Sequence, residues 1–258
     1  MSDQQSEQKE VAKKAIGLLD LTNLNDDCRE ADVIALCKRA QTPFGNTAAI
    51  CIWKEFIPVA KKALEGTEIK IATVVNFPKG GTDTEAVLAE VSTAIENGTD
   101  EIDLVFPYEA FLAGDLDICI DQIARVRDAC RTPILLKVII ETGRLVDEGA
   151  IYSASRLAID CGADFVKTST GKVEVNATPE VAKIMLRAIK DSGKGVGFKP
   201  AGGIKTVEDA AKYLDIAAGI LGPEWASPNT MRFGASGVLD NLLAVLDGTN
   251  VKLNPTGY

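Results

Sequence analysis

The chain has 258 residues, of which 46% are hydrophobic and 25% are charged, the composition of an ordinary soluble globular protein. Its formal net charge of -9 argues against a nucleic-acid partner, because phosphate backbones bind basic surfaces. Its apolar runs are too short to span a bilayer, and residues 1–10 are too polar for a secretory signal or an anchor, so we expect a cytoplasmic protein with no membrane partner.

The residue types that are missing restrict the chemistry. The sequence has no histidine, which excludes Ser-His-Asp and Cys-His catalysis, histidine general bases and the usual zinc sites. Any catalysis must therefore use lysine, carboxylates, hydroxyls or a cofactor. The cysteines form no CxxC pair, and without an export signal we expect reduced, mostly buried thiols at Cys28, Cys37, Cys51, Cys119, Cys130 and Cys161.

Short β-rich segments alternate along the chain with longer segments of helical period, which is typical of βαβ units around a parallel sheet. After an opening helix, strands are expected at residues 18–21, 48–53, 70–76, 101–106, 134–141, 165–169, 197–201 and 232–235. Eight strands close a (β/α)8 barrel, whose usual size is about 250 residues. We therefore predict an α/β fold, a (β/α)8 TIM barrel with an extra N-terminal helix, as a single domain over residues 1–258.

The segments between the strands carry helix start and stop signals. Residues 178–180 combine a capping threonine, a proline suited to the first turn and a glutamate at the positive end of the helix dipole. Gly193 is expected to end that helix. Thr206 with Asp209 resembles a capping box. Amphipathic patterns also predict helices over residues 83–95 and 116–130.

Two segments of the chain resemble each other. Residues 98–103 and 162–167 share a helix-ending glycine, an aspartate two residues on and a charged residue five residues on. They belong to the fourth and sixth expected strands, and alternate strands of such a barrel contribute side chains to the same interior layer. Asp103 and Lys167 are therefore expected to point into the barrel at similar height.

Lys199 lies on the seventh expected strand, next to the strand that carries Lys167. Neighbouring parallel strands lie about 4.8 Å apart, so the two amines are expected within several ångströms if both face inward. Repulsion and desolvation should lower the pKa of one amine toward neutrality, which would let it attack a carbonyl group. Asp103 would balance part of the charge and move protons. The alternative is a buried ion pair that only fills the barrel.

Four further residues have two interpretations each. Asp20, at the end of the first strand, and Lys137, within the fifth, interrupt apolar segments, and each either extends the charged network or forms a structural pair. Cys51 fits a packed core thiol better than a nucleophile. Tyr258 ends a tail that either frays or folds over the barrel mouth to contact substrate.

The loops after the seventh and eighth strands, residues 202–205 and 234–237, match the recurrent phosphate site of these barrels. Their glycines let backbone N–H groups approach an anion, and the following helix starts supply positive dipole ends, although such glycines also form plain turns. No P-loop or GxGxxG sequence is present, so a nucleotide is not indicated. With the loop after the sixth strand, the candidate binding residues are Thr168, Thr170, Gly171, Lys172, Gly202, Gly203, Lys205, Gly234 and Ser236.

Seven ordered motifs carry a resemblance that covers nearly the whole chain. They read Leu-Asp-Leu-Thr at 19–22, Gly-Asn-Thr-Ala-Ala-Ile-Cys at 45–51, Asn-Phe-Pro at 76–78, Glu-Ile-Asp-Leu-Val-Phe-Pro at 101–107, Leu-Lys-Val-Ile-Ile-Glu-Thr at 136–142, Phe-Val-Lys-Thr-Ser-Thr-Gly at 165–171 and Phe-Lys-Pro-Ala-Gly-Gly at 198–203. Together they resemble the class I deoxyribose-phosphate aldolases. That family interconverts 2-deoxy-D-ribose 5-phosphate with acetaldehyde and D-glyceraldehyde 3-phosphate.

The resemblance implies that Lys167 forms the Schiff base, that Lys199 lowers its pKa and joins the proton relay, and that Asp103 acts as acid and base through water. It also implies a sugar phosphate and acetaldehyde as partners, and a homodimer. The family pattern has arginine where Lys205 stands and a second serine where Gly237 stands, so the sequence departs from it at the phosphate end.

An iminium ion supplies its own electron sink, so a reaction of this kind needs no metal and no organic cofactor. Two other functions fit the same residues. One is another Schiff-base sugar-phosphate aldolase or a transaldolase-like barrel with a different donor. The other is a barrel that binds a sugar phosphate without catalysis.

Overall fold

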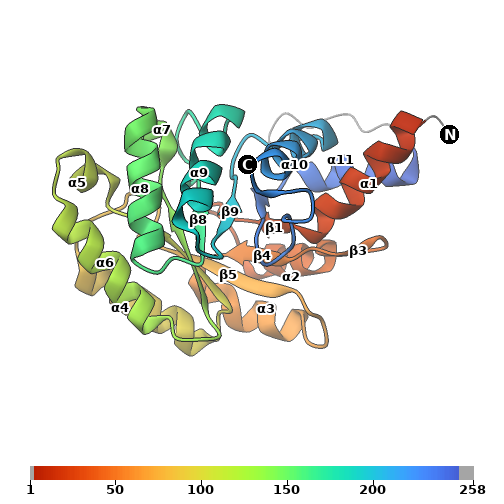
Figure 1. Ribbon diagram of the computed structural model, residues 1–258. Coiled ribbons are helices and arrows are strands. Elements are labelled where there is room, and N and C mark those ends of the chain that lie inside the picture. The colour runs from red at the N-terminus through yellow and green to blue at the C-terminus, as the bar shows by residue number, and fades with distance from the viewer. Residues whose placement is uncertain (1–2, 250–258) are drawn as a thin grey trace.

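A computed structural model describes residues 3–249 of the chain (Figure 1). Within these residues, eight parallel strands form one sheet in the order β10-β1-β4-β5-β6-β7-β8-β9. Each expected strand is present, and the predicted (β/α)8 barrel is confirmed. The strands are β1 Leu19–Thr22, β4 Ala49–Ile52, β5 Lys70–Val75, β6 Glu101–Val105, β7 Leu135–Ile139, β8 Phe165–Lys167, β9 Gly197–Lys199 and β10 Phe233–Ala235.

The sheet closes where its two edge strands, β9 and β10, come together. Parallel bridges join Phe198 to Met231 and Ala201 to Gly234. The amide of Gly234 also donates to the carbonyl of Pro200 at 2.9 Å. Because all eight strands run in the same direction, their carboxyl ends meet at one rim, where barrel enzymes place their chemistry.

Helices surround the sheet (Figure 1). The predicted extra helix is α1, which packs against α10 and α11 and begins early enough that most of the polar segment 1–10 is helical. In residues 3–249, none of the helices is long and apolar enough to cross a membrane. They are α1 Asp3–Gly17, α2 Glu30–Arg39, the 3-10 turn η1 Lys54–Phe56, α3 Ile57–Ala63, α4 Thr84–Asn97, α5 Tyr108–Leu112, α6 Leu116–Ala129, α7 Thr142–Leu145, α8 Glu148–Asp160, α9 Pro179–Ser192, α10 Val207–Leu221 and α11 Val238–Asp247.

The expected helix ends are found where the sequence signals place them. The hydroxyl of Thr178 accepts from the amide of Val181 at 3.2 Å at the start of α9, and Gly193 ends that helix in the left-handed conformation with φ 65°. Thr206 and Asp209 form the capping box of α10. These caps fix the points at which the chain leaves the rim of the barrel.

The lysine-bearing strands are shorter than expected, since β8 ends at Lys167 and β9 ends at Lys199. The hydroxyl of Thr168 accepts from the amide of Ala201 at 3.0 Å, so a side chain replaces the next backbone hydrogen bond between the two strands. Gly202 then turns the chain with φ 81°. Both lysines therefore stand at the last strand position, directly below the rim loops.

A small antiparallel hairpin, β2 Gln41–Thr42 with β3 Gly45–Asn46, stands outside the barrel and was not expected from the sequence (Figure 1). The hydroxyl of Thr42 closes its turn by donating to the carbonyl of Gly45 at 2.6 Å. Two residues per strand are too few for a periodic pattern, so only the turn could have indicated it.

The register of the sheet places several charged side chains inside the barrel. Asp103 of β6 pairs with Lys137 of β7, and Lys167 of β8 pairs with Lys199 of β9. Side chains alternate along a strand, so the residues between them pack against the helices. None of these four side chains is more than 3% exposed. Such burial requires each charge to have a partner.

Candidate active site

The centre of the barrel holds two lysine amines that share one carboxylate oxygen. Nζ of Lys167 donates to Oδ2 of Asp103 at 2.7 Å, and Nζ of Lys199 donates to the same oxygen at 2.8 Å. The three side chains come from β8, β9 and β6. The structure therefore brings together, at similar height, the three residues that the sequence placed at the site.

A third lysine completes the surroundings of this carboxylate. Nζ of Lys137 donates to Oδ1 of Asp103 at 2.8 Å and lies 2.5 Å from Oε2 of Glu101. Both oxygens of Asp103 thus contact cations. Lys137 belongs to the network rather than to a separate structural pair.

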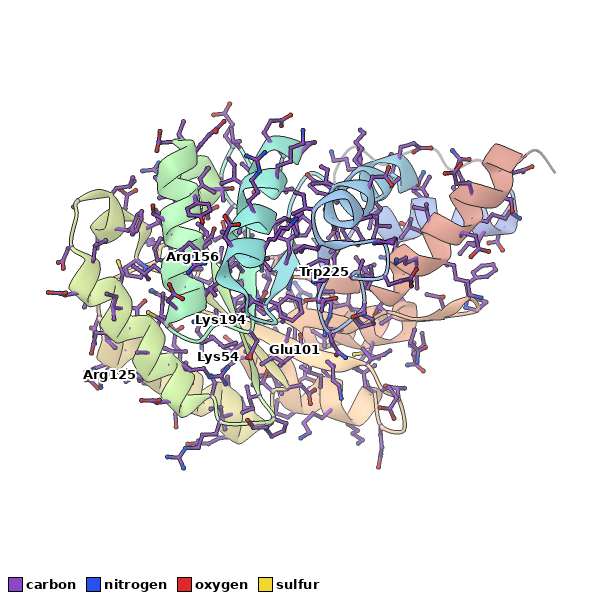
Figure 2. The ribbon with its side chains drawn as sticks, in the orientation of Figure 1. Lys54, Glu101, Arg125, Arg156, Lys194 and Trp225 are labelled. Atoms are coloured by element: carbon purple, nitrogen blue, oxygen red, sulfur yellow. The ribbon has the colours of Figure 1, made fainter. Side chains whose placement is uncertain are left out.

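Asp20 connects the amines to a second layer of charges nearer the strand starts. Its Oδ2 accepts from Lys199, and its Oδ1 accepts from the guanidinium of Arg232 at 2.7 Å. Arg232 also donates to Glu101, at 2.8 Å to Oε1 and 3.1 Å to Oε2. Figure 2 labels Glu101 among the strands near the middle of the ribbon. Since Glu101 also contacts Lys137, the ion pairs form a closed circuit.

Glu101 and Arg232 were not among the residues expected at the site. The rule that indicated Asp20 and Lys137, a charge within an apolar strand, applies equally to Glu101, which precedes Asp103 by two residues and therefore faces the same side. Arg232 stands directly before β10, and its guanidinium lies 5.7 Å from the centre of a phenylalanine ring, that of Phe165. Nothing in its sequence neighbours shows that it points inward.

The two central lysines have opposite pKa shifts. Burial lowers the pKa of Lys167, Asp103 opposes this effect, and Lys199 lowers the pKa further. Burial also acts to lower the pKa of Lys199, but Asp103 and Asp20 outweigh it and raise that pKa above its ordinary value. Lys167 is therefore the amine that gives up its proton more readily. This agrees in direction with the expectation that one amine becomes a nucleophile.

The carboxyl groups of the network are held in the charged form. Burial favours protonated Asp103, but Lys137, Lys167 and Lys199 hold its pKa well below the ordinary value. Burial acts on Asp20 in the same way, and its cationic neighbours, above all Lys199, lower its pKa as well. At neutral pH both side chains are therefore charged and accept hydrogen bonds from the amines around them.

Glu141 is a further buried carboxylate that sequence reasoning did not place at the site. It follows β7 in a left-handed conformation, with φ 53°, and its side chain is fully buried. Its Oε2 accepts from the hydroxyl of Thr170 at 2.5 Å, and that hydroxyl accepts from the amide of Lys172 at 3.0 Å. Burial raises the pKa of Glu141. Glu141 thus fixes the loop that follows Lys167.

The candidate binding residues occupy the rim but differ in what their groups already contact. Thr168 is buried, and its hydroxyl is used by the backbone of Ala201, so it joins two strands rather than facing the opening. Gly202 and Gly234 are linked by a backbone hydrogen bond of 3.2 Å that helps to close the barrel. Nζ of Lys172 donates to the carbonyl of Leu24 at 3.0 Å.

The remaining rim positions surround the starts of two helices. Lys205 has an exposed side chain, while its amide donates to Asp209 in the capping box of α10. Ser236 is half-buried just before α11. Gly171 and Gly203 both have positive φ, 80° and 82°, as turns require. A phosphate contact by any of these residues stays a prediction.

Cys51 and Tyr258 complete the set. Cys51 is fully buried inside the barrel beside Leu24, Ala72 and Val74. Burial raises the pKa of its thiol, which fits a packed core residue. The six cysteines are free thiols in the structure, as expected. Tyr258 lies outside the described residues.

Comparison with known proteins agrees with this geometry. The chain is 57% identical, over 251 residues that cover 97% of each chain, to the deoxyribose-phosphate aldolase of Agrobacterium fabrum strain C58. A crystal structure from Toxoplasma gondii ME49 shares the fold with a TM-score of 0.87 at 22% identity, covering 96% of this chain and 98% of that one. The tetrameric deoxyribose phosphate aldolase of Aeropyrum pernix also shares it, with a TM-score of 0.76 at 22% identity over 95% and 97% of the two chains.

A family model described as DeoC/LacD family aldolase matches residues 14–239, a range that contains every member of the charged network. The family model and the 57% identical relative each match most of the barrel. The chain belongs to the DeoC/LacD family of aldolases.

Proposed function

We propose that this chain is a class I deoxyribose-phosphate aldolase, which reversibly cleaves 2-deoxy-D-ribose 5-phosphate to acetaldehyde and D-glyceraldehyde 3-phosphate. The observation that carries the proposal is the position of Lys167, a buried amine with a lowered pKa that shares a carboxylate oxygen with Lys199. The family match and the 57% identical relative support the same activity.

In the cleavage direction, the free amine of Lys167 attacks the aldehyde carbon of the open-chain sugar phosphate, and the aldehyde oxygen leaves as water. The resulting iminium ion accepts the electron pair of the carbon–carbon bond that breaks, while the neighbouring hydroxyl loses its proton and becomes the aldehyde of glyceraldehyde 3-phosphate. Protonation of the enamine and hydrolysis then release acetaldehyde and the amine. Synthesis follows the same steps in reverse.

Asp103 and Lys199 are assigned the proton transfers. Asp103 is charged because three lysines hold its pKa low, so it is the acceptor, and it acts on the substrate through water. Lys199 keeps its proton because Asp103 and Asp20 raise its pKa, so it is the donor. Asp20 and Lys137 hold these two groups in place. Thr170 and the loop it stabilises shape the space beside the nucleophile.

We assign the phosphate group to the rim between the starts of α10 and α11. The backbone of Gly171 and Gly203, the side chains of Lys172 and Lys205, and Ser236 are the groups proposed to hold it. The positive ends of the two helices favour an anion there. The protein carries a net charge of -9, so this local arrangement must supply the attraction.

Trapping of the intermediate tests the proposal. The protein is incubated with acetaldehyde and sodium borohydride, and the modified lysine is identified by mass spectrometry of peptides. We expect a reduced two-carbon adduct on Lys167, with none on the exposed Lys194 as an internal control. Folded protein, verified by circular dichroism, whose Lys167 stays unmodified would overturn the mechanism. Activity that survives a metal chelator would separate the enzyme from a metal-dependent aldolase.

Substrate assays separate the alternatives. Release of glyceraldehyde 3-phosphate from deoxyribose 5-phosphate, followed with a coupled dehydrogenase, supports the proposed substrate. A transaldolase-like enzyme would instead form its adduct with a ketose phosphate and would not release acetaldehyde. A binding barrel without catalysis would bind the sugar phosphate and form no adduct.

We further propose that residues 1–258 act as one barrel domain in a cytoplasmic homodimer that has small-molecule partners only. The tetrameric relative from Aeropyrum pernix shows that another assembly occurs on this fold, so the dimer needs its own measurement. Size-exclusion chromatography with light scattering gives the mass of the assembly. A mass of one or four chains would contradict the dimer.

A further inference from the structure

We propose that Arg232 and Glu101, which make no ion pair with Lys167, are positioning residues that set its protonation state by completing a charge-balanced buried cluster. The inference rests on the proposed function, in which Lys167 reacts as a free amine. It concerns the second layer of charges, nearer the strand starts, which the aldol steps do not use.

The ion pairs join seven side chains into one cluster. Its carboxylates are Asp20, Glu101 and Asp103, and its cations are Lys137, Lys199, Arg232 and, when protonated, Lys167. Three carboxylates balance three permanent cations. The cluster is therefore neutral when Lys167 is a free amine and carries one excess positive charge when Lys167 is an ammonium.

Burial makes this balance matter. No side chain of the cluster is more than 3% exposed, so water screens the charges poorly. A net charge in such surroundings is costly, whereas paired charges that satisfy one another are tolerated. Electroneutrality therefore favours loss of the proton from Lys167, the one cation of this cluster that contacts a single carboxylate.

Arg232 is connected to the nucleophile through each of its two carboxylate partners, and a 3.7 Å contact between Lys137 and Asp20 joins the two routes. One passes through Asp20, Lys199 and Asp103, and the other passes through Glu101, Lys137 and Asp103. A change at Arg232 or Glu101 therefore reaches Lys167 from both sides of the same carboxylate. This connection does not require either residue to approach the substrate.

The guanidinium of Arg232 is also held in position independently of these ion pairs. Its Nε donates to the carbonyl of Pro228, and its Cζ lies over the ring of Phe165, 5.7 Å from the ring centre. That ring fills space left by Gly197, where a Cβ would approach it to 2.3 Å. The charge is thus fixed by packing as well as by its partners, as a positioning role requires.

Other titratable groups face Lys167 without joining the cluster. Cys51 approaches from β4, and burial raises the pKa of its thiol. Glu141 approaches from the end of β7; burial raises its pKa, and its carboxyl group is bound by Thr170. Burial thus opposes the charged form of each group. Asp103 from β6 and Lys199 from β9 are the charged groups that contact or face the amine directly.

Opposite substitutions give opposite effects. With Lys167 as a free amine, the Arg232→Gln cluster has a net negative charge. Lys167 should therefore retain its proton to higher pH. With Lys167 as a free amine, the Glu101→Gln cluster has a net positive charge. Lys167 should therefore lose its proton at lower pH. The double variant restores the balance and should return toward the parent. Each single change is expected to move the pH midpoint by on the order of one unit.

The measurement is the rate of reductive trapping of Lys167 by acetaldehyde and cyanoborohydride as a function of pH, read by peptide mass spectrometry. The amine attacks the carbonyl carbon, the oxygen leaves as water, and the reductant delivers hydride to the iminium carbon. The free-amine fraction controls the acidic limb of the profile. Arg232→Lys keeps the positive charge but loses the planar guanidinium that binds two partners at once. It is the matched control and should move the midpoint least.

Midpoints that stay unchanged, or that move in the same direction in both single variants, would overturn the proposal and leave these residues a structural role. If Arg232→Gln does not fold, the downward shift in Glu101→Gln decides the question. Failure of the proposed function looks different, because Lys167 of the parent protein would then form no adduct at any pH.

Discussion

The sharpest prediction concerns replacement of Lys199 by methionine, which removes the ammonium nearest the nucleophile and keeps an unbranched apolar side chain. Both ammonium nitrogens bond the same oxygen of Asp103, at 2.7 and 2.8 Å. By that geometry they lie roughly 5 Å apart or closer. Two unit charges at about 5 Å in an effective dielectric of about 20 repel by about 3 kcal/mol, or about two pKa units.

The sign follows from the charges. Lys199 disfavours a proton on Lys167, so its loss raises the pKa of Lys167, and the charges of Asp103 and Asp20, no longer balanced by Lys199, raise it further. The acidic limb of the trapping profile should move upward by about two pH units. Below both midpoints, the variant should trap acetaldehyde about a hundredfold more slowly than the parent at the same pH.

The assay is reductive trapping of Lys167 by acetaldehyde and cyanoborohydride across a pH series, with Lys194→Met as the control. Lys194 pairs with Asp160 at the surface, and its side chain is 49% exposed, so its removal should leave the profile unchanged. A Lys199→Met variant that is folded and slow but has an unshifted midpoint would refute the electrostatic reasoning. It would assign Lys199 to proton transfer alone.

Three further predictions test the rim and the core. Lys205→Arg should lower the KM for deoxyribose 5-phosphate several-fold with little change in kcat, because a guanidinium binds phosphate through two hydrogen bonds; an unchanged KM would place position 205 away from the phosphate. Glu141→Gln should raise that KM while Lys167 is still trapped, because the hydroxyl of Thr170 loses its carboxyl acceptor; equal losses in KM and in trapping would contradict this. Gly197→Ala should lower the free energy of unfolding in urea by roughly 1–3 kcal/mol because its Cβ would meet the ring of Phe165, whereas Gly195→Ala, with open space, should not.

The sequence was sufficient for the barrel strands and for the central trio for one physical reason. A barrel of parallel strands has a regular register, so residues at matching positions of β8 and β9 become neighbours, and Lys167 pairs with Lys199 as expected. What the pattern did not decide is which amine loses its proton. That depends on Asp20, which contacts Lys199 and makes no ion pair with Lys167 among the described residues, a contact across 179 positions of sequence.

The residues that were missed depend on side-chain direction. Arg232 and Glu101 are 131 positions apart in the sequence, and their pairing exists only once the ends of the sheet have met. Glu141 enters the site because its backbone adopts φ 53°, a conformation that non-glycine residues seldom take and that its neighbours do not signal. Short-range sequence patterns therefore located the rim loops and the two lysines. The charged groups that surround these lysines come together only when the barrel closes.

That second layer also explains why the barrel is not filled in the common way. Layers of branched aliphatic side chains pack such interiors, and replacing buried ion pairs by apolar residues is often neutral or stabilising. Here Glu101, Lys137 and Arg232 occupy interior space that such aliphatic side chains would otherwise fill. Of the cluster's cations other than Lys167, an aliphatic layer would leave Lys199 alone to balance Asp20 and Asp103, so a proton on Lys167 would be needed to balance the second carboxylate. The ionic layer is thus the arrangement that lets Lys167 stay uncharged beside Asp103 while Asp103 and Asp20 remain charged.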